Sequence, residues 1–271
     1  MVKLDSNAAW REASALIAAN RELFLALVGV FILLPSLASA VILGEPQIAP
    51  GMGGERMMAA VADFYGRAWW MIALSSAIQV IGVLAILTLM RDRRRPTVAE
   101  AIRAGGAGLL PYLAAHLLVA FGVAIFGVAV IGAAAAALPP LAAVLTLVIA
   151  GFIAFVMVRL ILVGPVIAVE GTRNPIAALR RSWALTRGNF WRILGFLVLV
   201  VLLFLVIAAV IMLVIGLVLA LVSSGETQRV LAAVASSALT AVGVLYFIGI
   251  VAAIHRQLAG PRQDLAAERV A

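Results

Sequence analysis

The chain has 271 residues, of which 65% are hydrophobic and only 12% are charged, and its mean hydropathy is +1.19. This composition excludes a soluble globular domain, because such domains carry about 25% charged residues. The formal net charge of +8 could indicate nucleic acid as a partner, but the arginine distribution described below explains it without one. With no cysteine and two histidines far apart in sequence, neither a metal nor a cofactor is expected.

The N-terminal segment, residues 1–22, is predicted to form a helix on the membrane surface. Trp10, Ala13 and Ile17 recur at helical spacing, whereas Arg11 and Glu12 occupy another face. The segment lacks the basic start, apolar centre and small-residue cleavage site of a signal peptide. We therefore expect the first span to remain in the mature protein.

Six nearly uncharged apolar runs follow, each long enough to cross about 30 Å of hydrocarbon as a helix. The polar interruption at 44–67 is too short to bury a core of its own, so we expect no soluble catalytic domain. Residues 255–271 would form a polar tail. The predicted all-α domain covers 23–254, with spans near 23–43, 68–90, 109–133, 141–164, 191–222 and 230–254.

The basic residues predict the orientation of these spans, since cytoplasmic loops of membrane proteins are enriched in Lys and Arg. Three basic residues fall on one side, Arg56, Arg67 and Arg229, and Arg159 lies within a span. Both termini are therefore expected in the cytoplasm, facing anionic lipid. The other sixteen of the twenty fall on the side of the termini: Lys3, Arg11, Arg21, Arg91, Arg93, Arg94, Arg95, Arg103, Arg173, Arg180, Arg181, Arg187, Arg192, Arg256, Arg262 and Arg269.

Two further segments are predicted to form surface helices. One is 96–105, where Thr97 and Glu100 have capping-box spacing and nearby glycines would let the chain turn into the third span. The other is 174–189, where Asn174 can cap, Pro175 suits the first helical position and Gly188 is a C-terminal stop. A unit of surface helix, outward span and returning span would thus occur three times, with the surface helices forming a cytoplasmic collar.

The stretch RLILVGPVIAVEGTRNPIAALRRSWALTRGNFWR, residues 159–192, resembles the membrane domain found with glycerophosphoryl diester phosphodiesterases and the related YciC-type bacterial membrane proteins. The resemblance implies a bacterial inner-membrane fold with six spans. It does not imply diesterase activity, because in those enzymes the chemistry resides in a separate soluble barrel. The matching positions are Arg159, Pro165, Glu170, Ala178, Leu179, Arg181, Ser182, Trp183, Leu185, Thr186, Gly188, Asn189 and Trp191.

Arg159 is the most informative single residue, because a guanidinium inside a span costs about 2.5 to 3.5 kcal/mol on insertion scales. Two interpretations remain open. In the first, Arg159 pairs with Glu170 or with carbonyl groups at the membrane interface. In the second, Arg159 and His116, at a similar depth in the third span, face a shared polar cavity that takes an anionic group.

We expect a non-enzymatic inner-membrane protein that binds, moves or organises anionic phospholipid or another amphiphile at the inner leaflet. Arg180, Arg181 and Arg187 would attract headgroups, while Trp183 and Trp191 would set the depth. One alternative is a structural or regulatory subunit that binds a partner membrane protein or a second copy of the chain. Another is a lipid-processing enzyme, although no acid, base and nucleophile constellation is recognisable.

Overall fold

The computed structural model describes residues 3–43, 48–49, 51–90, 96–137 and 139–260; within this range the side chains of 128, 131–137 and 139–143 are not described. The described residues are helical apart from short connections, so the predicted all-α class is confirmed. Six helices are long and apolar enough to cross a membrane, in agreement with the six predicted runs. The predicted basic cluster at Arg91 and Arg93 to Arg95, and Arg262 and Arg269 of the tail, lie outside the described residues.

The first hairpin follows a short N-terminal helix, α1 (Ser6–Ala19), whose first turn is capped by Asp5. The outward span is built from α2 (Arg21–Val28), a π-helical turn η1 (Gly29–Leu33) and α3 (Leu34–Leu43). The π turn lies just before Pro35, which has no N–H to continue the α-helical ladder, and the Leu34 N–H bonds instead to the Gly29 carbonyl. The returning span is α4 (Gly54–Leu89), so much of the predicted polar interruption at 44–67 is helical.

The second hairpin consists of α5 (Val98–Ala137) and α6 (Pro139–Leu160). The predicted surface helix at 96–105 is wrong as a separate element, because α5 runs without a break from Val98 into the span. The predicted capping box is present, with the Thr97 N–H donating to Glu100 and the Glu100 N–H donating to the Thr97 hydroxyl. The glycines at 105 and 108 do not make a turn. They let α5 lie against α4 and α7, where a Cβ would meet neighbouring atoms.

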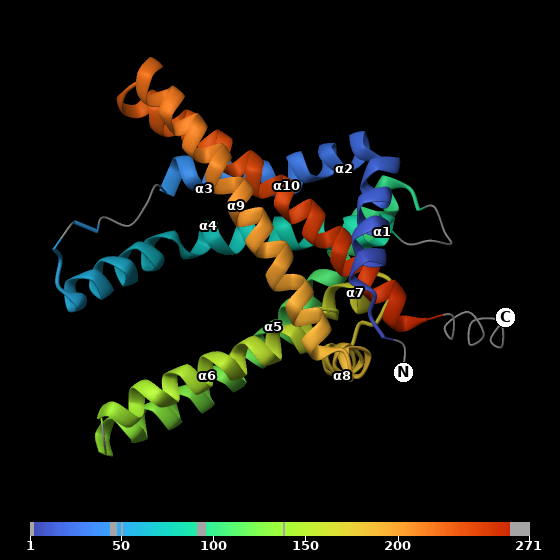
Figure 1. Cartoon of the computed structure of the whole chain (residues 1–271), viewed down its shortest axis with the longest axis horizontal. Helices are drawn as coiled ribbons and strands as arrows, with labels where there is room; N and C mark the ends of the chain where they lie inside the picture. Colours follow the sequence, from blue (N-terminus) through green and yellow to red (C-terminus); the bar gives the residue numbers. More distant parts are fainter. Residues whose placement is uncertain (1–2, 44–47, 50, 91–95, 138, 261–271) are drawn as a thin grey trace.

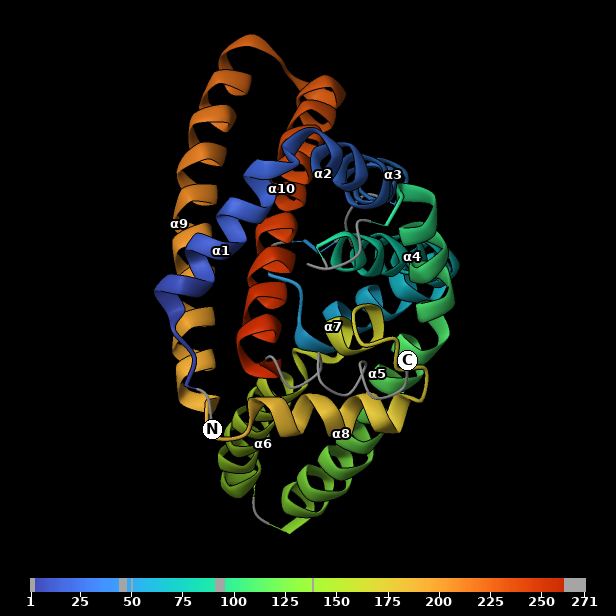
Figure 2. The same cartoon turned by 90° about the vertical axis from the view of Figure 1, so that its right-hand side faces the viewer.

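A compact connection joins the second hairpin to the third. It contains the short helix α7 (Val163–Ala168) and then α8 (Pro175–Thr186), which runs across the end of the molecule at a large angle to α9 and α10 (Figure 2). Asn174 caps α8 by accepting hydrogen bonds from the N–H groups of Ile176 and Ala177 at 2.9 and 3.2 Å. Gly188 ends this segment with a φ of +82°, which favours glycine.

The third hairpin is formed by α9 (Phe190–Val222) and α10 (Gly225–Ala259). The helix α1 lies across this pair (Figure 2) and buries Ala9, Ala13 and Ile17, two of which were predicted to form its apolar face. Ala13 and Ile17 reach Gly249 of α10. Trp10 is partly exposed and stacks on Tyr246, with ring centroids 6.0 Å apart.

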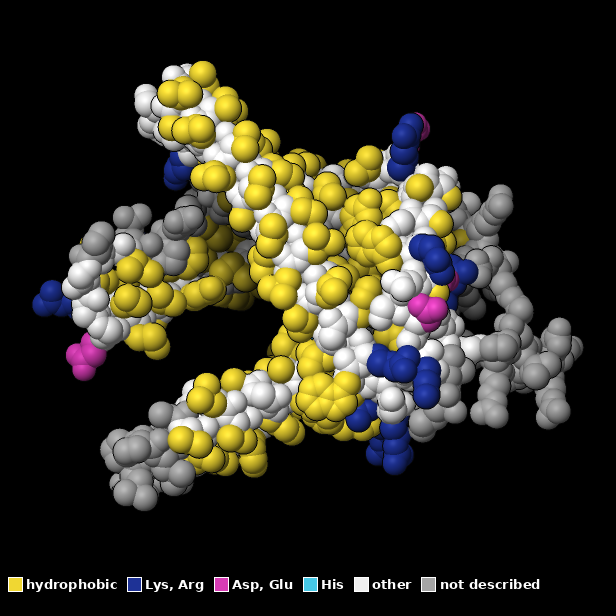
Figure 3. All heavy atoms as spheres, in the orientation of Figure 1, with side chains coloured by type: hydrophobic (Ala, Val, Ile, Leu, Met, Phe, Trp, Pro, Cys, Tyr) yellow, Lys and Arg dark blue, Asp and Glu magenta, His cyan; other side chains and the backbone are white. Residues whose placement is uncertain are grey.

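The three hairpins converge at one end of the molecule and diverge at the other (Figure 1). The helices α1, α7 and α8 gather at the convergent end, where most of the visible Lys and Arg side chains also lie (Figure 3). The long arms carry mainly hydrophobic side chains (Figure 3). We call the convergent end, with α1, α7, α8 and the start of α9, the basic end.

Candidate functional site

The basic end is held together by hydrogen bonds between α8 and the last turn of α6. The side chains of Ser182 and Thr186 are fully buried and donate to the backbone carbonyl of Arg159 at 2.8 and 3.3 Å. Carbonyls in the last turn of a helix have no partner within that helix, so these hydroxyls replace the missing backbone donors. The position of α8 is thereby fixed relative to α6.

The Arg159 side chain lies among three aromatic rings. The central carbon of its guanidinium is 5.1 Å from the ring centroid of Phe155, 5.2 Å from Trp183 and 5.9 Å from Phe190. Its Nε and Nη1 atoms are buried and have no hydrogen-bond partner among the described residues. Contacts with aromatic faces stabilise a cation by about 0.5 to 2 kcal/mol, but they do not satisfy these N–H groups.

The first interpretation from sequence had Glu170 or interfacial carbonyl groups as partners of Arg159, and its pairing with Glu170 is wrong. Glu170 binds two other side chains. Its Oε2 accepts from Nε of Arg181 at 3.0 Å, and its Oε1 lies 3.0 Å from Nε2 of His255. The Arg181 and His255 side chains reach Glu170 from α8 and α10, so the acidic residue joins these helices and is not available to Arg159.

His255 is a buried residue that the sequence reasoning missed. Its side chain is only 3% exposed, and that of Glu170 is 12% exposed. From the sequence, His255 was considered only as a possible metal ligand. The usable signal was that a histidine at the inner end of the last span needs a polar partner when buried.

Arg159 faces an open groove at the start of α9. The groove has a volume of about 620 Å³ and is lined by residues from α6, from the turn at Gly188 and from the first turn of α9. Trp191 is 79% exposed at this place. We call it the arginine groove; its lining residues are Gly151, Phe155, Arg159, Gly188, Phe190, Trp191 and Arg192.

Arg192, the second cation of the arginine groove, is bound by the N-terminal segment. Its Nη1 donates to the backbone carbonyl of Leu4 at 3.1 Å, and the Leu4 N–H donates to Oδ1 of Asn189 at 2.9 Å. Asn189 is 3% exposed. The contact between Leu4 and Asn189 could not be predicted from the sequence, because these residues lie 185 positions apart.

The other predicted headgroup residues lie near the arginine groove but not in it. Arg180 and Arg187 are exposed on α8 and at its end, whereas Arg181 is partly buried against Glu170. Trp183 is 40% exposed and touches the Arg159 cation with its ring. The arginine groove thus contains two arginines, Arg159 and Arg192, and the exposed Arg180 and Arg187 do not line it.

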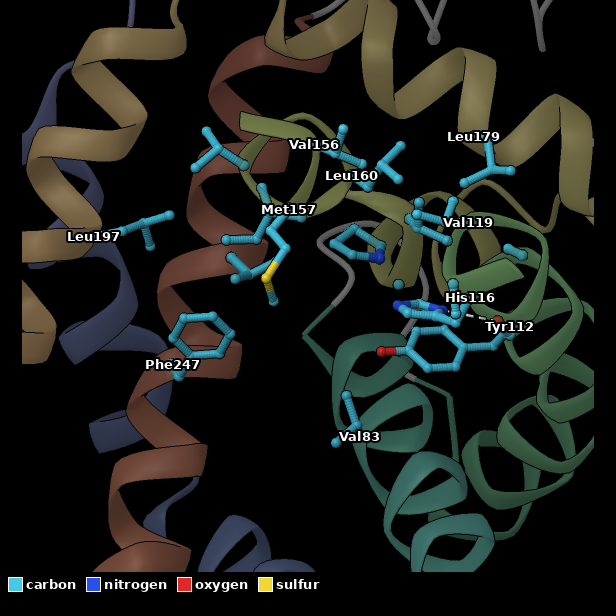
Figure 4. Close-up of a pocket in the computed structure, with 18 of the residues that line it drawn as sticks. Val83, Tyr112, His116, Val119, Val156, Met157, Leu160, Leu179, Leu197 and Phe247 are labelled. Carbon is cyan, nitrogen blue, oxygen red and sulfur yellow. Dashed lines mark hydrogen bonds between the residues drawn. The ribbon is translucent and has the colours of Figure 1, made fainter. Parts of the chain in front are cut away.

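His116 does not share the arginine groove. It lines a separate pocket of about 550 Å³ formed by residues of α4 to α10, which we call the apolar pocket (Figure 4). Its Nδ1 lies 2.8 Å from the backbone carbonyl of Tyr112, and the Tyr112 and His116 rings lie with centroids 4.0 Å apart. Arg159 and His116 therefore line two different pockets, and the cavity predicted to be common to them is not present in the described part of the chain.

The described residues contain no group of three or more His, Cys, Asp or Glu side chains that could hold a metal ion. At the basic end, the carboxylate of Glu170 lies beside a histidine and an arginine, but both of these bond to it, and Glu12 pairs with Arg256. Its arrangement suits the binding of an anion more than acid–base chemistry.

Comparison with known proteins identifies the segment that contains the arginine groove. Residues 139–258 match the family model for the membrane domain of glycerophosphoryl diester phosphodiesterase. This match confirms the family resemblance predicted from residues 159–192. No curated protein and no solved structure matches the chain.

The matched segment runs from the start of α6 almost to the end of α10. It contains every residue that lines the arginine groove and the whole Glu170, Arg181 and His255 cluster. The whole of α5, with Tyr112 and His116, lies outside it. The family model therefore covers the arginine groove and only part of the apolar pocket.

Proposed function

We propose that this membrane protein binds an anionic phospholipid or another anionic amphiphile, with the negatively charged headgroup in the arginine groove. The proposal includes the basic end at the cytoplasmic face of a bacterial inner membrane, because the six-span topology predicts sixteen of the twenty basic residues on the side of the termini. It assigns the protein binding or organisation of lipid, without a catalytic step.

The observation that carries the proposal is the state of the Arg159 guanidinium. It has two buried N–H-bearing atoms without a partner in the described structure and faces a groove. An unsatisfied buried donor costs about 1 to 3 kcal/mol, and more for a charged group. A phosphate oxygen in the groove would supply charge-assisted hydrogen bonds to the planar guanidinium.

The rest of the arginine groove supports the same ligand chemistry. Arg192 adds a second cation, and the first turn of α9 contributes residues to the lining. The N-terminus of a helix carries partial positive charge and free N–H groups, both of which favour an anion. Exposed Trp191 lies beside these groups, and tryptophan is enriched at the headgroup level of bilayers.

The test is a comparison of copurified lipid by native mass spectrometry. Arg159→Met keeps the length of the side chain and removes its charge, and we expect it to lose bound phosphatidylglycerol. Arg229→Met is the matched control, because Arg229 lies at the start of α10 and is exposed. If Arg159→Met and Arg192→Met both retain as much anionic lipid as the wild type, the proposal is wrong.

A second candidate is a structural subunit that holds a partner membrane protein or a second copy of this chain. The observation that favours it is the exposure of α9, because none of the residues in its most apolar stretch is buried within the chain. Cysteine cross-linking from exposed positions such as Leu205 and Leu213 tests this candidate. A specific cross-linked dimer or complex supports it, whereas labelling by lipid probes alone opposes it.

A further inference from the structure

The apolar pocket has a polar spot made by two neighbouring side chains of α5. Of its lining residues, only Tyr112 and His116 carry side-chain oxygen or nitrogen atoms. Their rings lie close and nearly parallel, with an interplanar angle of 31°. Figure 4 shows the Tyr112 hydroxyl and one His116 ring nitrogen on the same side, away from the α5 backbone.

The hydrogen bond to the backbone fixes what His116 can offer to a ligand. A backbone carbonyl only accepts, so Nδ1 of His116 must carry the proton that bonds to the Tyr112 carbonyl. In the neutral ring Nε2 is then an acceptor. The Tyr112 hydroxyl forms no hydrogen bond among the described residues, so it is free to donate or accept.

An acceptor beside a hydroxyl is complementary to an alcohol. A ligand hydroxyl can donate to Nε2 of His116 and accept from the Tyr112 hydroxyl at the same time, whereas an ether or a carbonyl can only accept. No charged side chain lines the pocket. A charged headgroup would therefore be buried here without a counter-charge, which is costly.

The other residues that line the apolar pocket indicate that the rest of the ligand is hydrocarbon. The volume of about 550 Å³ is within the range of small-molecule pockets, and the walls are aliphatic apart from Phe247. Met157, Val201 and Phe247 belong to the lining and are exposed. They come from α6, α9 and α10, so the pocket is accessible from the bilayer between these helices.

We propose that the apolar pocket binds an uncharged, long-chain lipid alcohol, with its hydroxyl between Tyr112 and His116 and its hydrocarbon chain against α6, α9 and α10. This site is separate from the arginine groove, and it does not depend on the function proposed for that groove. Its ligand differs in charge from the anionic headgroup assigned there.

The experiment uses a photoreactive hexadecanol and the corresponding methyl ether, each added to the protein in phosphatidylcholine nanodiscs. Labelled residues are located by peptide mass spectrometry. We expect labelling of pocket residues on α5, α6 and α10. The alcohol should label these residues about two- to tenfold more than the ether, because the alcohol forms one additional hydrogen bond.

Variants separate recognition of the hydroxyl from access to the pocket. His116→Phe removes the acceptor for the ligand hydroxyl, so it should reduce labelling by the alcohol to that of the ether and leave labelling by the ether unchanged. Tyr112→Phe removes the donor that either ligand can use, so it should reduce labelling by both. Ala120→Phe, at an exposed lining position, should reduce both. Leu117→Phe, next to His116 but outside the lining, should change neither.

Two results would overturn the proposal. One is equal labelling by alcohol and ether in the wild type, and the other is undiminished labelling by the alcohol in Tyr112→Phe. Thermal unfolding of each variant shows whether it is folded. Arg159→Met should not affect labelling by hexadecanol, so failure of the anionic site leaves this test intact.

Discussion

His255 of α10 and Glu170, which precedes α8, form a hydrogen bond 3.0 Å long across 85 residues of sequence. Glu170 also pairs with Arg181, so one carboxylate connects α8 to the last span. Arg181 and His255 thus each bond to the carboxylate of Glu170. Their arrangement explains why the acidic residue of the motif is not a partner for Arg159.

Replacing Glu170 with Gln should destabilise the protein by about 1 to 3 kcal/mol, because the Arg181 cation loses its counter-charge at a mostly buried site. The expected loss of thermal stability in detergent is roughly 2 to 10 °C. Glu226→Gln is the matched control, since Glu226 pairs with Arg229 at an exposed position. Equal melting temperatures for wild type and Glu170→Gln would contradict this role.

The close packing of α4 on α5 predicts different effects at two adjacent glycines. A Cβ at Gly105 would lie 2.5 Å from the backbone carbonyl oxygen of Ile81, whereas one at Gly106 would meet nothing within 4 Å. Gly105→Ala should therefore destabilise by about 1 to 3 kcal/mol. Gly106→Ala should be neutral or stabilising by up to about 1 kcal/mol. Thermal unfolding compares the two, and the reverse order would argue against the packing of α4 on α5.

The contact between Leu4 and Asn189 predicts how the N-terminal segment exchanges hydrogen. Asn189→Ala removes the acceptor of a buried N–H and should raise amide exchange in residues 3–17. Asn20→Ala is the control, because Asn20 is exposed and its side chain caps no helix. Hydrogen–deuterium exchange with mass spectrometry measures both. Unchanged protection in Asn189→Ala would show that the segment is held by other contacts.

Loss of the cap on α8 should be measurable as well. Asn174→Ala removes both acceptor contacts to Ile176 and Ala177 and should cost about 0.5 to 2 kcal/mol. Asn174→Asp keeps a capping oxygen and should restore most of the stability, which thermal unfolding in detergent can compare. If Asn174→Asp is as unstable as Asn174→Ala, the stabilising effect of Asn174 does not come from capping α8.

The absence of native cysteine allows a direct test of orientation. A single cysteine at Ser224, between α9 and α10, should react with a membrane-impermeant maleimide in intact cells. A single cysteine at Arg187, at the end of α8, should react only after the membrane is permeabilised. The opposite result would place the basic end outside the cytoplasm.

The sequence predicted the helical class, the six spans and the family of the inner loop, because each leaves a local pattern. Hydropathy shows a span directly, and the motif from Arg159 to Trp191 is contiguous. The surface helix at 96–105 was mispredicted since glycines at 105 and 108 were interpreted as a turn. In the structure the small size of these glycines allows close contact between helices. The sequence alone does not distinguish a glycine at a turn from a glycine at a helix contact.

The partners of Arg159 could not be predicted for a different reason. Sequence proximity favoured Glu170, which lies eleven residues further on, but α7 and the following turn carry Glu170 toward His255 and Arg181. The three aromatic contacts come from Phe155 on the same helix, Trp183 and Phe190. The Tyr112 and His116 pair needed only helical spacing of four residues and could have been found from the sequence.

The packing of α1 on α10 has a consequence for biosynthesis. Asp5 exchanges two backbone hydrogen bonds with the side chain of Gln257, 252 residues later, and Glu12 pairs with Arg256 at 2.8 Å. Because a chain is made from its N-terminus, α1 lacks its main packing partner, α10, until the last span has been inserted. The helix α1 is thus made before all six spans but is among the last elements to dock, and its amphipathic face stays at the membrane surface while the six spans are synthesised.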